Sequence, residues 1–387
     1  MTRDDTIPPL YIHIFCIISY FTAVFINEFS VTEHLNLVNL SSIQYQQISS
    51  VKLFGRLIAA AILLSLIQRS TFKTIINYSL ILYSICVFYI ISSDAFHSMT
   101  LLYFAIYSAS IMIISTILLG YILVDSTINN IYSISIYIIS ILTSYIISVC
   151  YEYFTISSTN DIFMLKIIAS NIFPLGAFFI TLMYSSSYKP KINLNEYRFF
   201  PVLKRMELEA LLGFVIFYCV VEIQNGYSNY ALANLLTIFN EVTRNSINIF
   251  ALLTAIGLNI FYCSKIKKHQ LSIASLFILN FTCLTMPNWS KYPLISAFGR
   301  VVLITTLYTI FMCSILMLVE KFKGINLFNA IAIYVFCAAS GYYCGYVTIA
   351  TSEETIGSNG LLISICFVLI GLLLYYLYFF KKHKLYR

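Results

Sequence analysis

Long stretches without a charged residue constrain the fold of this chain more than any other feature. Residues 75–92, 99–124 and 131–150 contain no Asp, Glu, Lys or Arg. A helix needs about 20 apolar residues to cross a hydrocarbon core of roughly 30 Å. The strands of a membrane barrel would instead be about 10 residues long with polar residues at alternate positions, a pattern that the sequence lacks. The chain is therefore predicted to be an all-α membrane protein.

The composition supports this prediction. Hydrophobic residues make up 60% of the 387 residues, charged residues only 10%, and the mean hydropathy is +0.86. Soluble domains carry about a quarter charged residues. Apolar runs separated by polar breaks predict twelve transmembrane helices, near residues 10–29, 51–68, 75–92, 99–124, 131–150, 162–184, 208–231, 247–263, 271–287, 294–319, 325–348 and 360–380.

A polar segment with five basic residues, 185–207, divides these helices into two sets of six. We therefore expect an N-terminal six-helix bundle over residues 1–184, a cytoplasmic linker over 185–207, and a C-terminal bundle with a basic tail over 208–387. Lys and Arg gather in cytoplasmic loops. An N-terminus on the cytoplasmic side places most of the 23 basic residues there, including those of the linker and of the C-terminal tail. Both termini are therefore predicted to be cytoplasmic, and the net charge of +7 requires no nucleic acid.

The two halves are predicted to be an internal repeat. A shift of about 196 residues carries the basic turn around Arg69 and Lys73 onto residues 263–270, and carries the third to fifth helices onto the ninth to eleventh. Two halves with the same number of helices that both start inside are related by a pseudo-twofold axis along the membrane normal. The segments INEFS (26–30) and IQNGYS (223–228) fall near equivalent places in the repeat.

This layout resembles the major facilitator superfamily (MFS) of transporters. The resemblance lies in the two six-helix halves, the central cytoplasmic loop and the short basic turns after the second and eighth helices. Of the family's motif in the turn after the second helix, the chain keeps the basic residues Arg69 and Lys73, whereas Leu64 and Gln68 stand where the family has Gly and Asp. The resemblance implies transport by alternating access, with the first, fourth, seventh and tenth helices lining a central cavity.

Charged residues inside the predicted helices mark candidate substrate-binding or coupling positions, because a charge in hydrocarbon costs roughly 3 kcal/mol. Glu222 and Arg300 lie at similar depths in the seventh and tenth helices. They are expected either to hold a polar substrate or to form a structural ion pair, and Glu222 could carry a coupling proton. Arg56 in the second helix is expected to pair with Glu28 of the first helix or to extend toward the outer surface.

Neutral side chains complete the predicted site. Asn27 in the first helix and Gln224 and Asn225 in the seventh are expected to form hydrogen bonds to a substrate or to one another. On the cytoplasmic side, Asp125 at the end of the fourth helix is expected to meet the basic turn of Arg69 and Lys73 as a gate contact.

The sequence contains no metal, phosphate-loop, hydrolase or dinucleotide motif, so no cofactor and no nucleic-acid partner are expected. We predict a monomeric secondary transporter of a small polar or amphipathic solute, coupled to protons or sodium and located in a bacterial inner membrane, not an enzyme. The alternative is a membrane enzyme or flippase of polysaccharide assembly. The longest predicted outer loop, residues 30–50, carries a single acid, Glu33, beside His34, which offers little equipment for catalysis.

Overall fold

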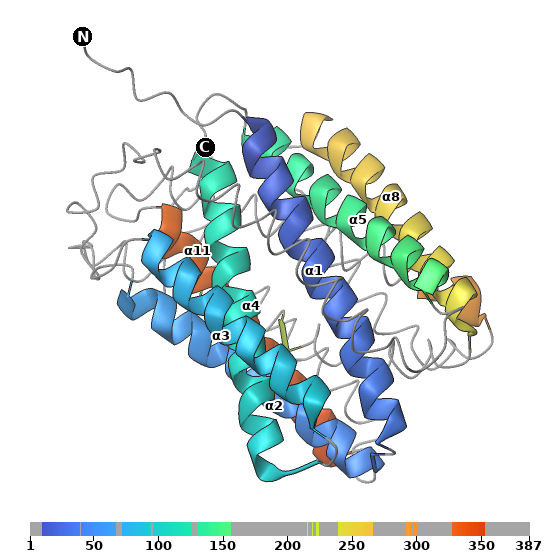
Figure 1. Cartoon of the computed structure of the whole chain (residues 1–387). Coiled ribbons are helices and arrows are strands. Elements are labelled where there is room, and N and C mark those ends of the chain that lie inside the picture. The colour runs from blue at the N-terminus through green and yellow to red at the C-terminus, as the bar shows by residue number, and fades with distance from the viewer. Residues whose placement is uncertain are drawn as a thin grey trace. The chain divides into compact units, whose positions relative to one another are not determined.

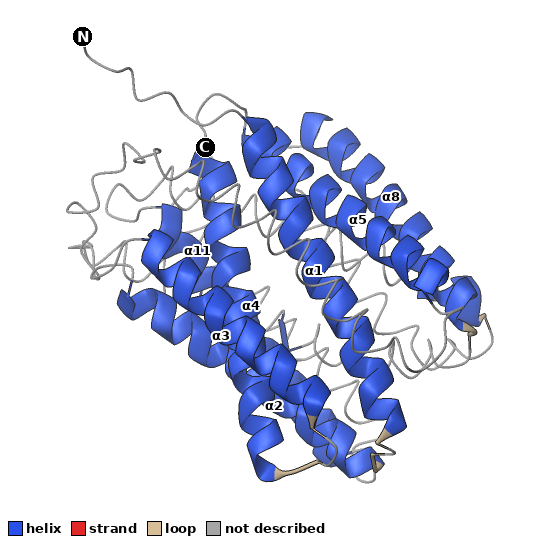
Figure 2. Ribbon diagram, viewed as in Figure 1, coloured by secondary structure: helices blue, strands red, loops and turns tan. Residues whose placement is uncertain are grey.

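The structure is a computed structural model of the chain. The described residues are 10–38, 40–66, 72–93, 96–124, 130–155, 215, 219, 222–223, 239–265, 292–295, 297–299 and 327–352. They form helices throughout and include no strand (Figure 2). Seven helices are complete within these residues: α1 (Leu10–Leu37), α2 (Ser42–Leu66), α3 (Phe72–Ser92), α4 (Ser98–Val124), α5 (Asn130–Thr155), α8 (Glu241–Lys265) and α11 (Leu327–Ser352).

Three of these helices contain windows that are long and apolar enough to cross a membrane: Tyr11–Thr32, Ile75–Ser92 and Ser98–Gly120. The second window coincides with the predicted range 75–92. Half of its residues are buried within the protein. Its exposed side chains are large and apolar, including Tyr78, Ile85 and Phe88. Such a helix is stable with one face in lipid and the other against its neighbours, as expected for a polytopic membrane protein.

The first two helices are longer than predicted, because helical structure continues past the apolar residues. α1 runs on to Leu37 and α2 begins at Ser42, so the predicted outer loop over 30–50 is wrong and the connection is only residues 38–41. A capping box fixes the start of α2: the Ser41 hydroxyl accepts from the Gln44 amide at 3.3 Å, and the Ser41 amide donates to Gln44 Oε1 at 2.8 Å. In α8, the side chain of Asn240 likewise accepts from the amide of Thr243 at 2.8 Å.

Replacing Ser41 by alanine is expected to lower the stability of the protein by about 1 kcal/mol, because two backbone amides at the start of α2 lose or weaken their partners. The measurement is the midpoint of thermal unfolding of the detergent-purified protein. Ser49→Ala in the interior of α2 is the matched control, since alanine favours a helix interior. If Ser41→Ala lowers the midpoint of thermal unfolding no more than Ser49→Ala does, the capping box does not stabilise α2.

Within the first five helices, α1 packs along α5 and α3 packs along α4 (Figure 1). Small hydroxyl residues allow the approach of α1 and α5: Ser140, Ser144 and Ser148 repeat every four residues on α5 and all three are buried. The Ser144 hydroxyl lies 3.1 Å from the carbonyl oxygen of Ile18 on α1 and 2.7 Å from that of Ser140. Aromatic side chains of α1, among them Phe21 and Phe25, make edge-to-face contacts with tyrosines of α5.

α2 and α4 approach closely at Gly55. A Cβ atom at this position would meet the carbonyl oxygen of Ala105 and lie 2.9 Å from its carbonyl carbon and 3.0 Å from its Cα. On α11, Gly341 has a similar role: a Cβ atom there would meet the carbonyl oxygen of Cys219 and lie 2.8 Å from the Cβ of Glu222. Gly341 therefore marks a close helix contact, as small residues do in other membrane bundles.

The predicted repeat is visible in the helix bounds. A shift of 197 residues carries both ends of α5 onto those of α11, and a shift of 199 carries both ends of α2 onto those of α8. These values lie within three residues of the shift of about 196 that the sequence predicts. The two pairs of equivalent helices therefore have equal lengths as well as equivalent places in the chain.

The chain separates into two compact units. One comprises Met1–Gly55 and Ser65–Arg198, and the other comprises Arg56–Leu64 and Phe199–Arg387. The predicted linker 185–207 and the predicted helices near 162–184, 208–231, 271–287, 294–319 and 360–380 lie wholly or largely outside the described residues, so the boundaries predicted for the two halves stay predictions.

Candidate functional site

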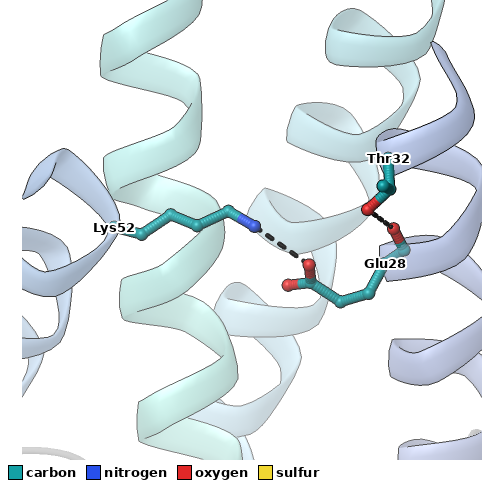
Figure 3. Close-up of polar contacts among 3 residues, drawn as sticks. All are labelled: Glu28, Thr32 and Lys52. Carbon is teal, nitrogen blue, oxygen red and sulfur yellow. Dashed lines mark hydrogen bonds and ion pairs between the residues drawn. The ribbon is translucent and has the colours of Figure 1, made fainter. Parts of the chain in front are cut away.

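An ion pair joins α1 and α2 in the first unit. Lys52 Nζ lies 2.9 Å from Glu28 Oε2, and the two side chains point toward each other between the helices (Figure 3). Both are shielded in part from solvent, with exposed fractions of 22% for Lys52 and 36% for Glu28. The hydroxyl of Thr32 donates to the backbone carbonyl oxygen of Glu28 at 2.7 Å, one turn further along α1. Two opposite charges therefore meet where α1 carries its apolar window.

Aromatic rings from α4 lie against this ion pair. Lys52 Nζ is 5.4 Å from the centre of the Phe104 ring and 5.7 Å from that of Tyr107. Both distances are within the range of cation–π attraction, which contributes about 0.5–2 kcal/mol according to solvent exposure. The Tyr107 ring in turn stacks on that of Tyr83 from α3, with centres 5.3 Å apart and planes inclined by 20°. The ammonium of Lys52 thus has a carboxylate on one side and aromatic faces on another.

Asn27 connects α1 to the same aromatic group. Its side chain is completely buried, and its amide nitrogen donates a hydrogen bond to the hydroxyl of Tyr83. Its carbonyl oxygen, Oδ1, has no hydrogen-bond partner within the described part of the chain. A buried polar atom without a partner typically costs about 1–3 kcal/mol. Such an atom is either a structural defect or the acceptor for a group that the protein binds.

These side chains form one polar layer near one end of the helices. Glu28, Lys52, Tyr83 and Tyr107 each lie nine or ten residues, about 14 Å, from the nearest end of their own helix. Those four ends are joined by the connections 38–41 and 93–97. His34 Nε2 lies 2.9 Å from the carbonyl oxygen of Ser93, so the two connections also meet in space. We call the residues of this layer the polar cluster: Asn27, Glu28, Lys52, Tyr83, Phe104 and Tyr107.

A buried carboxyl group lies in the second unit. Glu222 is completely buried, and Gly341 of α11 packs directly on its side chain and on the backbone of Cys219. The Cys219 thiol lies 3.7 Å from the hydroxyl of Ser340 on α11. The acid is therefore enclosed by protein at a tight helix contact, where its charged form needs a partner or a proton.

The structure brings together two of the predicted site residues, Asn27 and Glu28. Glu28 pairs with Lys52, which lies one turn of α2 before Arg56. The sequence analysis gave Arg56 as one candidate partner of Glu28. Arg56 is exposed and belongs to the other unit. Lys73 lies in α3, but its side chain, like the whole of Arg69, Asp125, Gln224, Asn225 and Arg300, lies outside the described residues. The predicted gate and the predicted pair of Glu222 with Arg300 stay predictions.

Four members of the polar cluster, Lys52, Tyr83, Phe104 and Tyr107, were missed. Lys52 is the second residue of the predicted helix 51–68, and a basic residue at the edge of an apolar segment gives no reason to select it. The capping box at Ser41 and Gln44 could have corrected this, because it starts the helix ten residues before Lys52. Nothing in the sequence separates Tyr83 and Tyr107 from the other tyrosines, of which the chain has 31.

Comparison with solved structures identifies the architecture. The MFS transporter FucP in its outward conformation matches with a TM-score of 0.62 and 14% identity, over 96% of this chain and 98% of that one. The MFS proton:xylose symporter XylE, bound to 6-bromo-6-deoxy-D-glucose, matches with a TM-score of 0.62 and 14% identity, over 95% of both chains. The chain has the MFS fold. The predicted all-α MFS fold is confirmed, and the count of six helices in each half stays a prediction.

Sequence comparison adds a relative of the same length. A protein described as uncharacterized, RP255 of Rickettsia prowazekii (strain Madrid E), is 24% identical over 387 residues, which is the whole of both chains. No protein-family model matches the sequence. The MFS fold of this chain is therefore recognised from its structure, because its sequence is only 14% identical to those of the solved transporters. In such a fold the polar cluster lies among membrane helices.

Proposed function

We propose that the chain is a secondary active transporter that moves a small polar solute across a membrane by alternating access, with a proton as the coupling ion. The observation that carries the proposal is the polar cluster: an ion pair and a buried amide among the helices of an MFS fold. Charged groups in transmembrane helices are costly to insert and typically mark substrate or ion pathways. The long apolar helices of the first unit support a multi-pass location in the membrane.

The structural neighbours support the choice of coupling ion. XylE is described as a proton:xylose symporter, and the Escherichia coli FucP, which matches with a TM-score of 0.60 at 14% identity over 97% of this chain and 99% of that one, as a fucose:proton symporter. In this chain, Glu28 lies in the apolar window of α1 and Glu222 is buried, and each is a candidate proton carrier. A bacterial inner membrane, cytoplasmic termini and action as a monomer belong to the same proposal.

The proposal excludes catalysis by the chain. A membrane enzyme of polysaccharide assembly would need an extended outer segment to hold a diphosphate-linked sugar. The connection between α1 and α2 is only residues 38–41, which shortens the longest outer loop expected from the sequence and supports the transporter. Polymer formation by the purified protein from a lipid-linked oligosaccharide would favour the enzyme instead.

Uptake into proteoliposomes tests the proposal. The full-length protein is reconstituted with the interior one pH unit more alkaline than the exterior, and the radiolabelled solutes are D-xylose, L-fucose, L-alanine, L-lactate and glycolate. We expect at least one solute to accumulate, up to about tenfold for electroneutral one-to-one symport, since one pH unit corresponds to 1.36 kcal/mol. A protonophore should abolish the accumulation. Uptake of every solute at the rate of protein-free liposomes would exclude the proposed function.

A further inference from the structure

The ion pair of the polar cluster sets a condition on what the protein can carry. Glu28 and Lys52 together are neutral, and the ammonium of Lys52 lies against the rings of Phe104 and Tyr107. If Glu28 takes up a proton, the positive charge of Lys52 loses its carboxylate partner at 2.9 Å. The aromatic faces attract this charge but do not neutralise it. An anion that pairs with Lys52 would restore neutrality at this place.

We propose that the transported solute is a small organic anion, which takes the place of the Glu28 carboxylate at Lys52 when Glu28 is protonated. This inference rests on the proposed transport function and assigns its substrate class. The solute and the proton would bind together: a proton on Glu28 releases Lys52, and the anion then pairs with Lys52. Neither site changes covalently, and one proton and one negative charge cross the membrane together.

Electrostatics makes this exchange a coupling mechanism. The empty protein has a neutral Glu28–Lys52 pair, and the loaded protein, with a proton on Glu28 and an anion on Lys52, is neutral at the same place. A protonated protein without an anion carries an extra positive charge, and an anion without the proton adds a negative one. Unbalanced charge within membrane helices is strongly unfavourable. The two neutral states therefore change between inward and outward forms most readily, which couples one anion to one proton.

Among the described residues, Lys52 is a charged neighbour of Glu28. The titratable groups that face the carboxyl from the described parts of the neighbouring helices are Lys52 from α2, Tyr83 from α3 and Tyr107 from α4. Tyrosine is neutral at ordinary working pH. On α1 itself, His34 lies further along and hydrogen bonds to Ser93. From α5, Tyr145 packs on the rings of Phe25 and Phe29. Protonation of Glu28 thus changes the charge that acts on Lys52.

The polar cluster also specifies the rest of the solute. A single ammonium with three donors matches one carboxylate group. Oδ1 of the fully buried Asn27 lacks a donor in the described structure, and the same amide hydrogen bonds to Tyr83, whose ring stacks on Tyr107 beneath Lys52. A solute hydroxyl would supply that donor. The class that fits both groups is a short hydroxycarboxylate monoanion, and L-lactate and glycolate are its simplest members.

Uptake by the reconstituted full-length protein tests this assignment. The probes are radiolabelled L-lactate and glycolate as anions and D-xylose and L-fucose as neutral solutes. We expect wild-type protein to accumulate an anion in response to a proton gradient. Lys52→Gln should reduce this uptake at least about tenfold, because the cationic partner of the anion is lost. Lys52→Arg should retain most of it, and Arg244→Gln, which removes an exposed cation at the start of α8, is the matched control and should transport as wild type.

The Glu28→Gln substitution should uncouple the flux of the anion from the flux of protons. A glutamine mimics the protonated acid, so Lys52 stays available and the anion should still cross. Its uptake should no longer respond to the proton gradient, and it should instead respond to a potassium diffusion potential that is positive inside. A structural role for Glu28 would not change the response to membrane potential in this way. Loss of proton dependence in Glu222→Gln with its retention in Glu28→Gln would overturn the assignment.

The remaining outcomes distinguish a failure of the proposed substrate class from a failure of the proposed transport function. Transport of D-xylose or L-fucose without transport of either anion would overturn the substrate class and leave the transporter proposal standing. Transport of an anion that survives Lys52→Gln unchanged would also overturn the inference. Uptake of none of the solutes in either experiment would reject the transport function itself.

Discussion

Replacing Gly55 by alanine is expected to destabilise the protein by several kcal/mol. The added Cβ would meet backbone atoms of Ala105, which belong to α4 and cannot rotate away as a flexible side chain can. Overpacking a tight contact typically costs about 1–3 kcal/mol even where side chains can adjust. Here α2 and α4 must separate, and Lys52, one turn before Gly55, would move away from Phe104 and Tyr107.

Thermal unfolding of the detergent-purified variant, followed by size-exclusion chromatography, measures this effect. Gly257→Ala in α8 is the matched control, because in the described structure a Cβ placed there meets nothing within 4 Å beyond the adjacent backbone of its own helix. Alanine is favoured over glycine in a helix by about 1 kcal/mol, so the control should be as stable as wild type or more stable. Equal unfolding temperatures for the two variants would show that α2 and α4 do not meet at Gly55.

Helix starts and ends were predictable where the apolar pattern coincides with the helix. The range 75–92 ends where α3 ends, and 99–124 reproduces α4 to within one residue. The errors at α1, α2 and α8 share a cause, because hydropathy reports the hydrocarbon-crossing part of a helix and the hydrogen-bonded helix extends beyond it. At α2 and α8 the true starts follow from the capping residues Ser41 and Asn240, whose signal is independent of hydropathy.

The site was predictable only in part. The free-energy cost of placing a charge in an apolar helix marked Glu28 as a candidate site residue. The same cost does not identify the partner of Glu28. Lys52 and Arg56 lie one turn apart on α2, so a sequence cannot decide between them without the helix start and the direction of each side chain. The positions of Tyr83 and Tyr107 depend on how α3 and α4 pack, and 31 tyrosines give no basis for selecting two. The internal repeat was easier to predict than the site, because its detection needs only the spacing of the helices along the chain.

Replacing Asn27 by leucine is expected to abolish transport while costing little stability when Tyr83 is replaced by phenylalanine at the same time. The double variant Asn27→Leu/Tyr83→Phe removes both partners of a buried hydrogen bond, a change that can be nearly neutral, within about 1 kcal/mol. It also removes the buried Oδ1 atom that has no partner among the described residues. Stability would therefore be kept, while the acceptor proposed for the solute would be lost.

Uptake of the solute by the reconstituted double variant should fall at least about tenfold, because a site built to accept a hydrogen bond loses that contact. Thr22→Val is the matched control. It removes another buried oxygen without a partner from the same helix, outside the polar cluster, and should leave uptake unchanged. Wild-type uptake by a folded Asn27→Leu/Tyr83→Phe protein would mean that Asn27 only fixes α1 against α3. A loss of uptake at unchanged stability would instead place the solute at Asn27, because the packing of the two helices would then be intact.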